Sequence, residues 1–242
     1  MTVDPFRYLP DLVGMIRDPA QSSYRKFDFA VLDQKMAERG IVDWRRTDED
    51  REASRQTALA GRLNDDLWVF AYGSLMWDPG FHFAEVRRAT VNGYRRRFCL
   101  KTTLGRGTPE KPGLMAALDG GGECHGLAYR IDSEQADSET QIIWAREMIM
   151  HAYRPAFIEL ATPQGSVEAL TFVIDHSATS YMHDLSIEEA AQLIATGAGI
   201  FGKNLDYLDS LAEHFAVLGI DDEELFTLHA LAREFAEKAP AE

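Results

Sequence analysis

Cysteine, paired histidines and positive charge are all in short supply in this sequence of 242 residues, and each shortage excludes a class of protein. There are two cysteines, Cys99 and Cys124, and neither has a second cysteine or a histidine at the spacing of metal ligands. We expect both to be reduced residues of the core. The seven histidines form no HExxH or similar pair. The sequence therefore predicts no disulfide framework and no metal site.

A long apolar run is also missing. A helix that crosses a bilayer needs roughly 20 consecutive apolar residues, and no segment approaches that length. The first residues, MTVDPFRYLPDLVG, carry Asp4 and lack the basic start and apolar block of a signal peptide. We therefore expect a cytoplasmic protein.

The net charge is −14, whereas binding to nucleic acid or to an acidic membrane needs a basic face. Neither is therefore expected as a partner. The charge is uneven, because residues 67–131 hold nine basic and five acidic residues. Such a region can attract a small anion. Alternatively, Arg95, Arg96 and Arg97 simply cover one exposed strand edge. Both explanations remain open at this point.

The chain divides by composition into an N-terminal helical extension, residues 1–66, and a folded domain, residues 67–242. Helices are predicted over 28–39 and 48–63. From Leu67 onward, short runs rich in Val, Phe, Tyr and Leu are separated by glycines. These runs predict strands at 67–72, 86–102, 114–118, 124–130 and 168–175, with turns at Gly93, Gly105, Gly107, Gly113 and Gly120–Gly122.

Helices dominate the rest of the chain. They are predicted from Ser133 or Ser138 to Ala152, and over 186–196, 204–218 and 222–238. Ser186 and Glu189 have the spacing of a capping box, in which each side chain accepts from the other's backbone N–H. Strands first and helices later, without regular alternation, predict an α+β fold whose antiparallel or mixed sheet could close.

The segment QIIWAREMIMHAY contains a candidate catalytic acid. Its apolar residues surround nearly the whole helical projection, so we expect the segment to be buried. Glu147 stands four residues after Ile143 and three before Met150, on the same apolar stripe. A buried carboxylate is costly unless it is paired or has a chemical role. One explanation is an ion pair with an arginine from a strand. The other is a general acid and base, since burial raises a carboxyl pKa toward neutrality.

A second candidate is WVFAYGSLMW, residues 68–77, where an apolar strand breaks at Gly73 and Ser74 and the chain is apolar again from Leu75. Such a corner serves either tight packing or the close approach of a ligand. Successive N–H groups at a Gly-Ser corner can converge on an anion.

Two further segments carry candidate residues. The glycines and prolines of TTLGRGTPEKPGLMAAL, residues 102–118, predict a shaped loop. Arg106 and Lys111 on this loop could meet a ligand carboxylate, or they could simply face solvent. In GIFGKNLDYLDSL, residues 199–211, Tyr207 falls on the first turns of a helix, where packing is the more common role.

Together and in this order, these segments resemble the ChaC-type γ-glutamylcyclotransferases. The resemblance runs from about Trp68 to about Leu211. In addition, the helical segment that precedes the YGSL strand is similar to that of bacterial members. It rests on six motifs: VFAYGSLMWDP (69–79), VNGYRRRFCL (91–100), GRGTPEKPG (105–113), GLAYR (126–130), REMI (146–149) with Tyr153, and GKNLDYL (202–208).

The resemblance implies a small mixed or antiparallel β-barrel flanked by helices. It also implies cleavage of glutathione to 5-oxoproline and cysteinylglycine with no cofactor. The family's catalytic glutamate corresponds to Glu147 through REMI. The expected substrate-binding residues are Tyr72, Gly73, Ser74, Leu75, Arg106, Gly107 and Tyr207. The first four form the substrate-cradling loop, which favours a ligand as the reason for the corner.

Two departures from the family pattern bear on substrate preference. Leu114 follows Pro112-Gly113 where an arginine is common, and Met150-His151-Ala152 stands where a glycine often precedes the tyrosine. Both could alter how the cysteinylglycine end is held. Two other functions are therefore considered. One is a cyclotransferase for other γ-glutamyl amines or amino acids, and the other is a non-catalytic binding or regulatory protein on the same fold.

Overall fold

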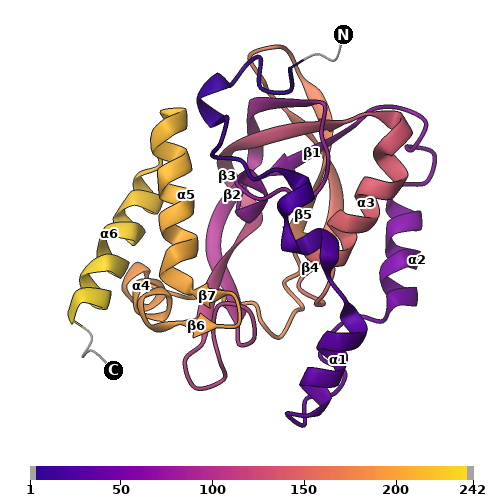
Figure 1. Cartoon of the computed structure of the whole chain (residues 1–242). Helices are drawn as coiled ribbons and strands as arrows, with labels where there is room; N and C mark the ends of the chain where they lie inside the picture. The colour runs from indigo at the N-terminus through magenta and orange to yellow at the C-terminus, as the bar shows by residue number, and fades with distance from the viewer. Residues whose placement is uncertain (1–3, 239–242) are drawn as a thin grey trace.

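A mixed five-stranded sheet lies at the centre of the fold, in the order β2-β3-β1-β5-β4 (Figure 1). The structure is a computed structural model that describes residues 4–238. The strands are β1 (Leu67–Ala71), β2 (Glu85–Thr102), β3 (Gly113–Ile131), β4 (Tyr153–Leu160) and β5 (Val167–Ile174), and a separate small sheet pairs β6 (Ala198–Gly199) with β7 (Gly202–Lys203). β1 and β5 are parallel, whereas β1–β3, β2–β3 and β4–β5 are antiparallel.

Helices cover the sheet from two sides, so the predicted α+β class is confirmed. The helices are α1 (Phe29–Ala37), α2 (Asp48–Ala58), α3 (Ser133–Glu147), α4 (Ile187–Thr196), α5 (Asn204–Leu218) and α6 (Glu223–Lys238). Figure 1 shows α2 and α3 side by side at one flank and α4, α5 and α6 grouped at the other. The predicted capping box is confirmed: Ser186 Oγ accepts from Glu189 N at 3.2 Å, and Ser186 N donates to Glu189 Oε2 at 2.9 Å.

β2 and β3 form one long ribbon that bends in the middle. The second half of β3 is antiparallel to β1, and β1 is parallel to β5. Yet Leu118, in the first half of β3, pairs in parallel with Val173 of β5. The direction of β3 relative to β5 therefore reverses between Leu118 and Leu127.

Glycines make this bend possible, and the predicted turn at Gly120–Gly122 is wrong. The strand continues through these residues, and the pairing with β2 becomes irregular between Asn92 and Tyr94. Gly93, Gly121 and Gly122 have φ of 84°, 92° and 82°, in the left-handed region that residues with a Cβ rarely adopt. The sequence indicated where the chain changes direction, but not that β3 stays hydrogen-bonded to β2 on both sides of the bend.

The sheet closes at one end. Thr90 of β2 exchanges two backbone hydrogen bonds with Ala161, the residue after β4, at N···O distances of 2.9 and 2.8 Å. The first and last strands of the sheet are thereby joined, as the predicted small barrel requires.

Helix α3 ends at Glu147, five residues earlier than predicted, and β4 was not predicted at all. The apolar pattern continues through Met150 and gives no stop signal. The segment after the helix is held by the extension, since Arg46 N donates to Ile149 O at 2.8 Å and Arg46 Nε donates to Met150 O at 3.2 Å. Glu147 is the last residue of its helix rather than a middle one.

The main hydrophobic core lies between the sheet and the helices and also receives residues of the extension. Leu12, Ile16 and Leu59 are at most 6 % exposed and pack in this core. Cys99 and Cys124 are both buried and free, as expected. Across residues 4–238, no helix combines the length and the apolar character needed to cross a membrane.

Candidate active site

Glu147 lies at the end of α3, mostly enclosed by the protein. Its side chain is 16 % exposed, so it is neither sealed in the core nor free in solvent. Burial raises the pKa of this carboxyl above its usual value, and the nearby Arg146 guanidinium opposes that rise. A carboxyl with a raised pKa and a remaining opening suits a group that exchanges protons with a ligand.

Three tyrosines surround Glu147, each from a different element. They are Tyr72 after β1, Tyr153 at the start of β4, and Tyr207 in α5. Burial raises the pKa of all three hydroxyls, and the negative charge of Glu147 raises them further. They therefore stay neutral at physiological pH, and Arg146 is the charged group that acts on the pKa of Glu147.

The hydroxyls of two of these tyrosines are held by backbone carbonyls. Tyr72 donates to Phe172 O at 2.8 Å, and Tyr153 donates to Ala116 O at 3.2 Å. These bonds fix the rings around Glu147. Sequence reasoning proposed Tyr72 and Tyr207, but Tyr153 was only noted beside the REMI motif.

Arg146 joins Glu147 to the Gly73–Ser74 corner, and sequence reasoning did not identify it as a functional residue. Its Nε lies 3.2 Å from Glu147 Oε1, and its Nη2 donates to Ser74 Oγ at 2.7 Å. Its Nη1 donates to the backbone carbonyl of Asp78. The side chain is 5 % exposed, so this is a buried cation whose donors are used to position its neighbours.

The ion-pair explanation for Glu147 is thus partly correct, but the partner is its neighbour in sequence rather than an arginine from a strand. Adjacent charged residues on a helix usually point apart, which is why the sequence gave no signal for this pair. The contact becomes possible because the helix ends at Glu147.

The predicted corner begins directly after β1. Residues Ser74–Met76 form one turn of 3₁₀ helix, in which Met76 N donates to Gly73 O at 2.8 Å. Among the described residues, the N–H groups of Gly73, Ser74 and Leu75 donate to no protein acceptor. The first N–H groups of any helix lack intrahelical partners. Gly73 and Leu75 are buried, so these donors are well placed to receive an anionic ligand.

Packing also requires the glycine at the corner. A Cβ on Gly73 would lie 2.8 Å from the hydroxyl of Tyr207, which is itself buried. The two explanations that the sequence left open are therefore compatible. Tyr207 occupies the side-chain space of Gly73, and the N–H groups of the same corner have no acceptor among the described residues.

Arg96 supports the corner from the neighbouring strand. Its Nε donates to Tyr72 O at 2.7 Å, its Nη2 donates to His125 O at 2.5 Å, and its Nη1 pairs with Asp222 at 2.9 Å. Arg97 pairs with Asp119 at 2.9 Å. Arg96 is buried, so these two arginines are not merely the covering of an exposed strand edge.

The predicted loop between β2 and β3 lies against α5 and the β6–β7 turn. Arg106 Nη1 donates to Lys203 O at 2.8 Å, and its charge lowers the pKa of Tyr207, against the larger effect of burial. Arg106 therefore lies beside the site. Gly107 is buried against the backbone of Gly113 and Thr102, where a Cβ would collide. Its position indicates a packing role, at the base of the loop that carries Arg106.

Asn204 anchors the other end of this loop. Its Oδ1 accepts from Leu114 N at 2.6 Å and its Nδ2 donates to Leu114 O at 3.0 Å. The side chain thus substitutes for a strand neighbour at the start of β3. Leu114 is fully buried in the main core, so the residue that departs from the family pattern packs inside the protein.

A metal site is not evident in this region. Throughout the described ranges, no three histidine, cysteine, aspartate or glutamate side chains gather closely enough to hold an ion. The residues collected here are one acid, two buried arginines, three tyrosines and a run of backbone amides.

The chain is similar in sequence to known proteins. Residues 67–235 match the model of the ChaC-like protein family. A glutathione-specific γ-glutamylcyclotransferase of Escherichia coli strain K12 is 40 % identical over 179 residues, which cover 73 % of this chain and 78 % of that protein. The human glutathione-specific γ-glutamylcyclotransferase 1 is 32 % identical over 158 residues, 63 % of this chain and 71 % of that protein.

The fold is also similar to that of a solved structure. A yeast γ-glutamylcyclotransferase specific to glutathione superposes with a TM-score of 0.68 at 21 % identity, over 73 % of this chain and 99 % of that one. Identity at this level supports the fold alone. With the family match covering more than half of the sequence, the chain belongs to the ChaC-like family.

Proposed function

We propose that this chain is a γ-glutamylcyclotransferase that cleaves glutathione to 5-oxoproline and cysteinylglycine. The observation that carries the proposal is the pairing of Glu147, an acid of raised pKa, with a corner whose amides are free to bind an anion. The names of the curated relatives give the substrate class. Glu147 is the proposed catalytic residue.

The reaction needs no protein nucleophile. The α-amine of the γ-glutamyl group attacks its own γ-carbonyl, a C–N bond closes the five-membered lactam, and the original amide C–N bond breaks. Two protons leave the substrate ammonium and two reach the departing nitrogen. Glu147 carries protons between these nitrogens, accepting from the first and donating to the second. Holding the two reacting ends in contact lowers the barrier by several kcal/mol, on the order of the known effect of proximity.

The corner supplies the electrostatic part of the proposed mechanism. The N–H groups of Gly73, Ser74 and Leu75 are placed to bind the α-carboxylate or the oxyanion that forms on the γ-carbonyl. Tyr72 and Tyr207 enclose the γ-glutamyl chain and keep its polar end away from water. Arg106, at the outer edge, is suited to the carboxylate of the departing dipeptide. Gly107 supports that arginine through backbone packing.

We further propose that residues 67–242 form the cyclotransferase domain and residues 1–66 an extension attached to it. The family match, which begins at residue 67, supports this division. A cytoplasmic location is proposed because both cysteines are free, as is usual in a reducing compartment.

Two other functions compete with this proposal. A cyclotransferase for other γ-glutamyl amines would use the same lactam-forming groups, and would differ only where the leaving group binds. A non-catalytic binding protein would derive no benefit from an acid whose burial disfavours its charge. The position of Glu147 therefore favours an enzyme.

The decisive experiment is incubation of the purified protein with glutathione, followed by detection of 5-oxoproline and cysteinylglycine. Production of both in equal amounts supports the proposal. Equal turnover of γ-glutamyl-alanine moves the assignment to the broader class of cyclotransferases. Binding of glutathione without any 5-oxoproline would support the non-catalytic alternative.

A further inference from the structure

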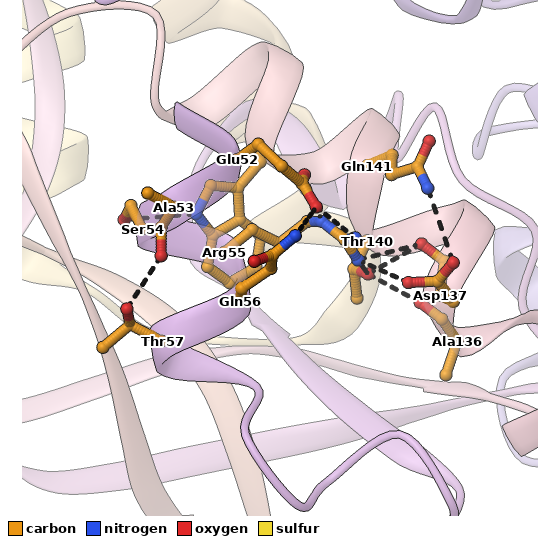
Figure 2. Close-up of polar contacts among 11 residues, drawn as sticks. Glu52, Ala53, Ser54, Arg55, Gln56, Thr57, Ala136, Asp137, Thr140 and Gln141 are labelled. Carbon is orange, nitrogen blue, oxygen red and sulfur yellow. Dashed lines mark hydrogen bonds and ion pairs between the residues drawn. The ribbon is translucent and has the colours of Figure 1, made fainter. Parts of the chain in front are cut away.

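The N-terminal extension is fastened along the length of α3, the helix that ends in Glu147. Figure 2 shows the first attachment, where Arg55 of α2 reaches toward α3. Arg55 Nη1 donates to Asp137 Oδ1 at 2.8 Å and to Thr140 Oγ1 at 3.0 Å, while Glu52 holds its Nε at 2.8 Å. The Arg55 side chain is 6 % exposed. The arginine is buried, whereas the Asp137 and Glu52 side chains that bind it are 62 % and 42 % exposed, so these are charge-assisted contacts at the edge of the interface.

Further attachments follow toward the end of the helix. Arg25 pairs with the buried Glu139, with Nη1–Oε2 and Nη2–Oε1 distances of 2.5 and 3.2 Å. Trp144 Nε1 donates to Ser54 Oγ at 3.4 Å. The extension thus contacts α3 from Asp137, in its second turn, to Trp144, in its last turn.

One more contact between the extension and α3 reaches the active site. The Cζ of Arg146 lies 3.9 Å from the centroid of the Tyr24 ring. Tyr24 is in turn in ring contact with Phe27 and Phe201, at centroid distances of 5.5 and 6.3 Å. One face of the guanidinium is therefore covered by an aromatic ring from the extension, while its edges contact Ser74, Asp78 and Glu147.

We propose that Tyr24 of the extension is a positioning residue of the active site, which holds the Arg146 guanidinium against Ser74 and Glu147. The inference rests on the proposed function and assigns a role within it to residues 1–66. A cation over a ring is attracted to the ring face, and the attraction grows where water is excluded. The planar guanidinium is thereby fixed in the one orientation that serves the corner and the catalytic acid together.

The experiment compares Tyr24→Leu, which removes the ring, with Tyr24→Phe, which keeps it. Tyr8→Leu is the matched control: Tyr8 is also an extension tyrosine covered by an arginine, with Arg7 Cζ 4.7 Å from its ring centroid. We expect Tyr24→Leu to lower kcat for glutathione about tenfold, with a smaller change in KM, because geometry at the reacting atoms is lost rather than binding. Tyr24→Phe and Tyr8→Leu retain wild-type kcat.

Thermal denaturation of all three variants separates positioning from general support. The proposal is overturned if Tyr24→Leu keeps the wild-type kcat, or if Tyr8→Leu loses as much activity for the same drop in Tm. It is equally overturned if Tyr24→Phe is as impaired as Tyr24→Leu, since the hydroxyl would then be the active part.

A second readout does not depend on turnover, so it separates this inference from the proposed function. The pKa of Glu147 is measured by NMR titration of ¹³C-labelled glutamate carboxyls, with the signal assigned by its loss in Glu147→Gln. The groups around Glu147 are Arg146, Tyr72, Tyr153 and Tyr207, and the tyrosines are neutral near pH 7. The Arg146 charge lowers the pKa of Glu147. We therefore expect Tyr24→Leu, which no longer holds Arg146 against Glu147, to raise that pKa, and Tyr8→Leu to leave it unchanged. An unchanged pKa in both overturns the positioning role, even for a protein that fails to cleave glutathione.

Discussion

The hydroxyl of Tyr207 lies 2.8 Å from the point that a Cβ on Gly73 would occupy. Tyr207 belongs to α5 and Gly73 to the corner after β1, so two segments that are far apart in the sequence are in direct contact here. Tyr207 is 2 % exposed and cannot swing into solvent. The glycine therefore determines how closely α5 approaches the corner amides.

This contact predicts that Gly73→Ala is costly and that Tyr207→Phe partly rescues it. Overpacking of this kind typically costs about 1–3 kcal/mol, and we expect kcat/KM to fall as the corner shifts. Removing the hydroxyl leaves the ring carbon Cζ 3.9 Å from the new methyl group, an ordinary contact. Chemical denaturation of the two single variants and the double variant measures the coupling. Strictly additive effects would show that the two groups do not meet.

Glu147→Gln is expected to lower kcat by about 10²–10⁴ while the protein remains folded, because glutamine matches the shape of glutamate but carries no exchangeable carboxyl proton. Glu139→Gln is the matched control on the same helix. Glu139 is also buried, but its carboxylate is bound to Arg25 and accepts from His82 N at 2.8 Å. We expect Glu139→Gln to lower the stability of the fold and to keep the kcat of the wild type. Near-normal turnover by Glu147→Gln would make Glu147 a structural residue.

The rate of the reaction should fall at acidic pH along a limb set by Glu147. The carboxyl must be ionised to accept a proton, and burial raises its pKa above the usual value of about 4.3 for glutamate. The acidic limb of kcat/KM is therefore expected above that value, and it should disappear from the residual activity of Glu147→Gln. A limb at or below the usual glutamate pKa would contradict the assignment.

The same shift predicts how stability depends on pH. A carboxyl whose pKa is higher in the folded state destabilises the fold once pH rises past its unfolded pKa, and the full penalty is present above the folded pKa. Glu147→Gln removes this penalty. The variant should therefore be more stable than the wild type near neutral pH, and the difference should vanish below about pH 4. Tm measured across this range tests the sign. A variant that is less stable at neutral pH would show that the Arg146 pair outweighs burial.

Local patterns in the sequence were sufficient to predict most elements, since periodicity and the Ser186 cap act within a few residues. They failed where distant segments decide. The chain that follows the end of α3 at Glu147 is held by Arg46 of the extension, and the bend of β3 accompanies its pairing with β2 and β5. The pairing of the Asn204 side chain with the backbone of Leu114 is likewise visible only once β3 and α5 are side by side.

The candidate site shows the same division. Glu147 and the Gly73–Ser74 corner stand out in the sequence, because an acid in an apolar helix and a break in an apolar strand are local anomalies. Arg146 does not, because a charged residue beside another on a helix is ordinary. Its role appears only in three dimensions, where it contacts Ser74, Glu147 and Tyr24 together.

Arg106 is expected to determine the preference for substrates with a carboxylate on the leaving group. It lies beside Tyr207 on a loop held by Gly107 and Asn204, at the outer edge of the site, where its free donors can form a charge-assisted pair. The test compares glutathione with a derivative whose glycine carboxylate is converted to an amide. For the wild type we expect kcat/KM to favour glutathione by about tenfold or more, since a site built for a charge loses much of its binding when that charge is absent.

In Arg106→Ala the ratio of kcat/KM for glutathione to kcat/KM for the amide derivative should fall toward one. The glutathione carboxylate loses its charged partner, whereas the uncharged amide loses little binding. Arg106→Lys keeps the charge and should keep part of the preference. Lys101→Ala, which removes an exposed cation from β2, controls for the general field of the basic region. A preference that is unchanged in Arg106→Ala would place the dipeptide carboxylate elsewhere. If the preference falls equally in Lys101→Ala, it arises from the summed charge of residues 67–131 rather than from Arg106.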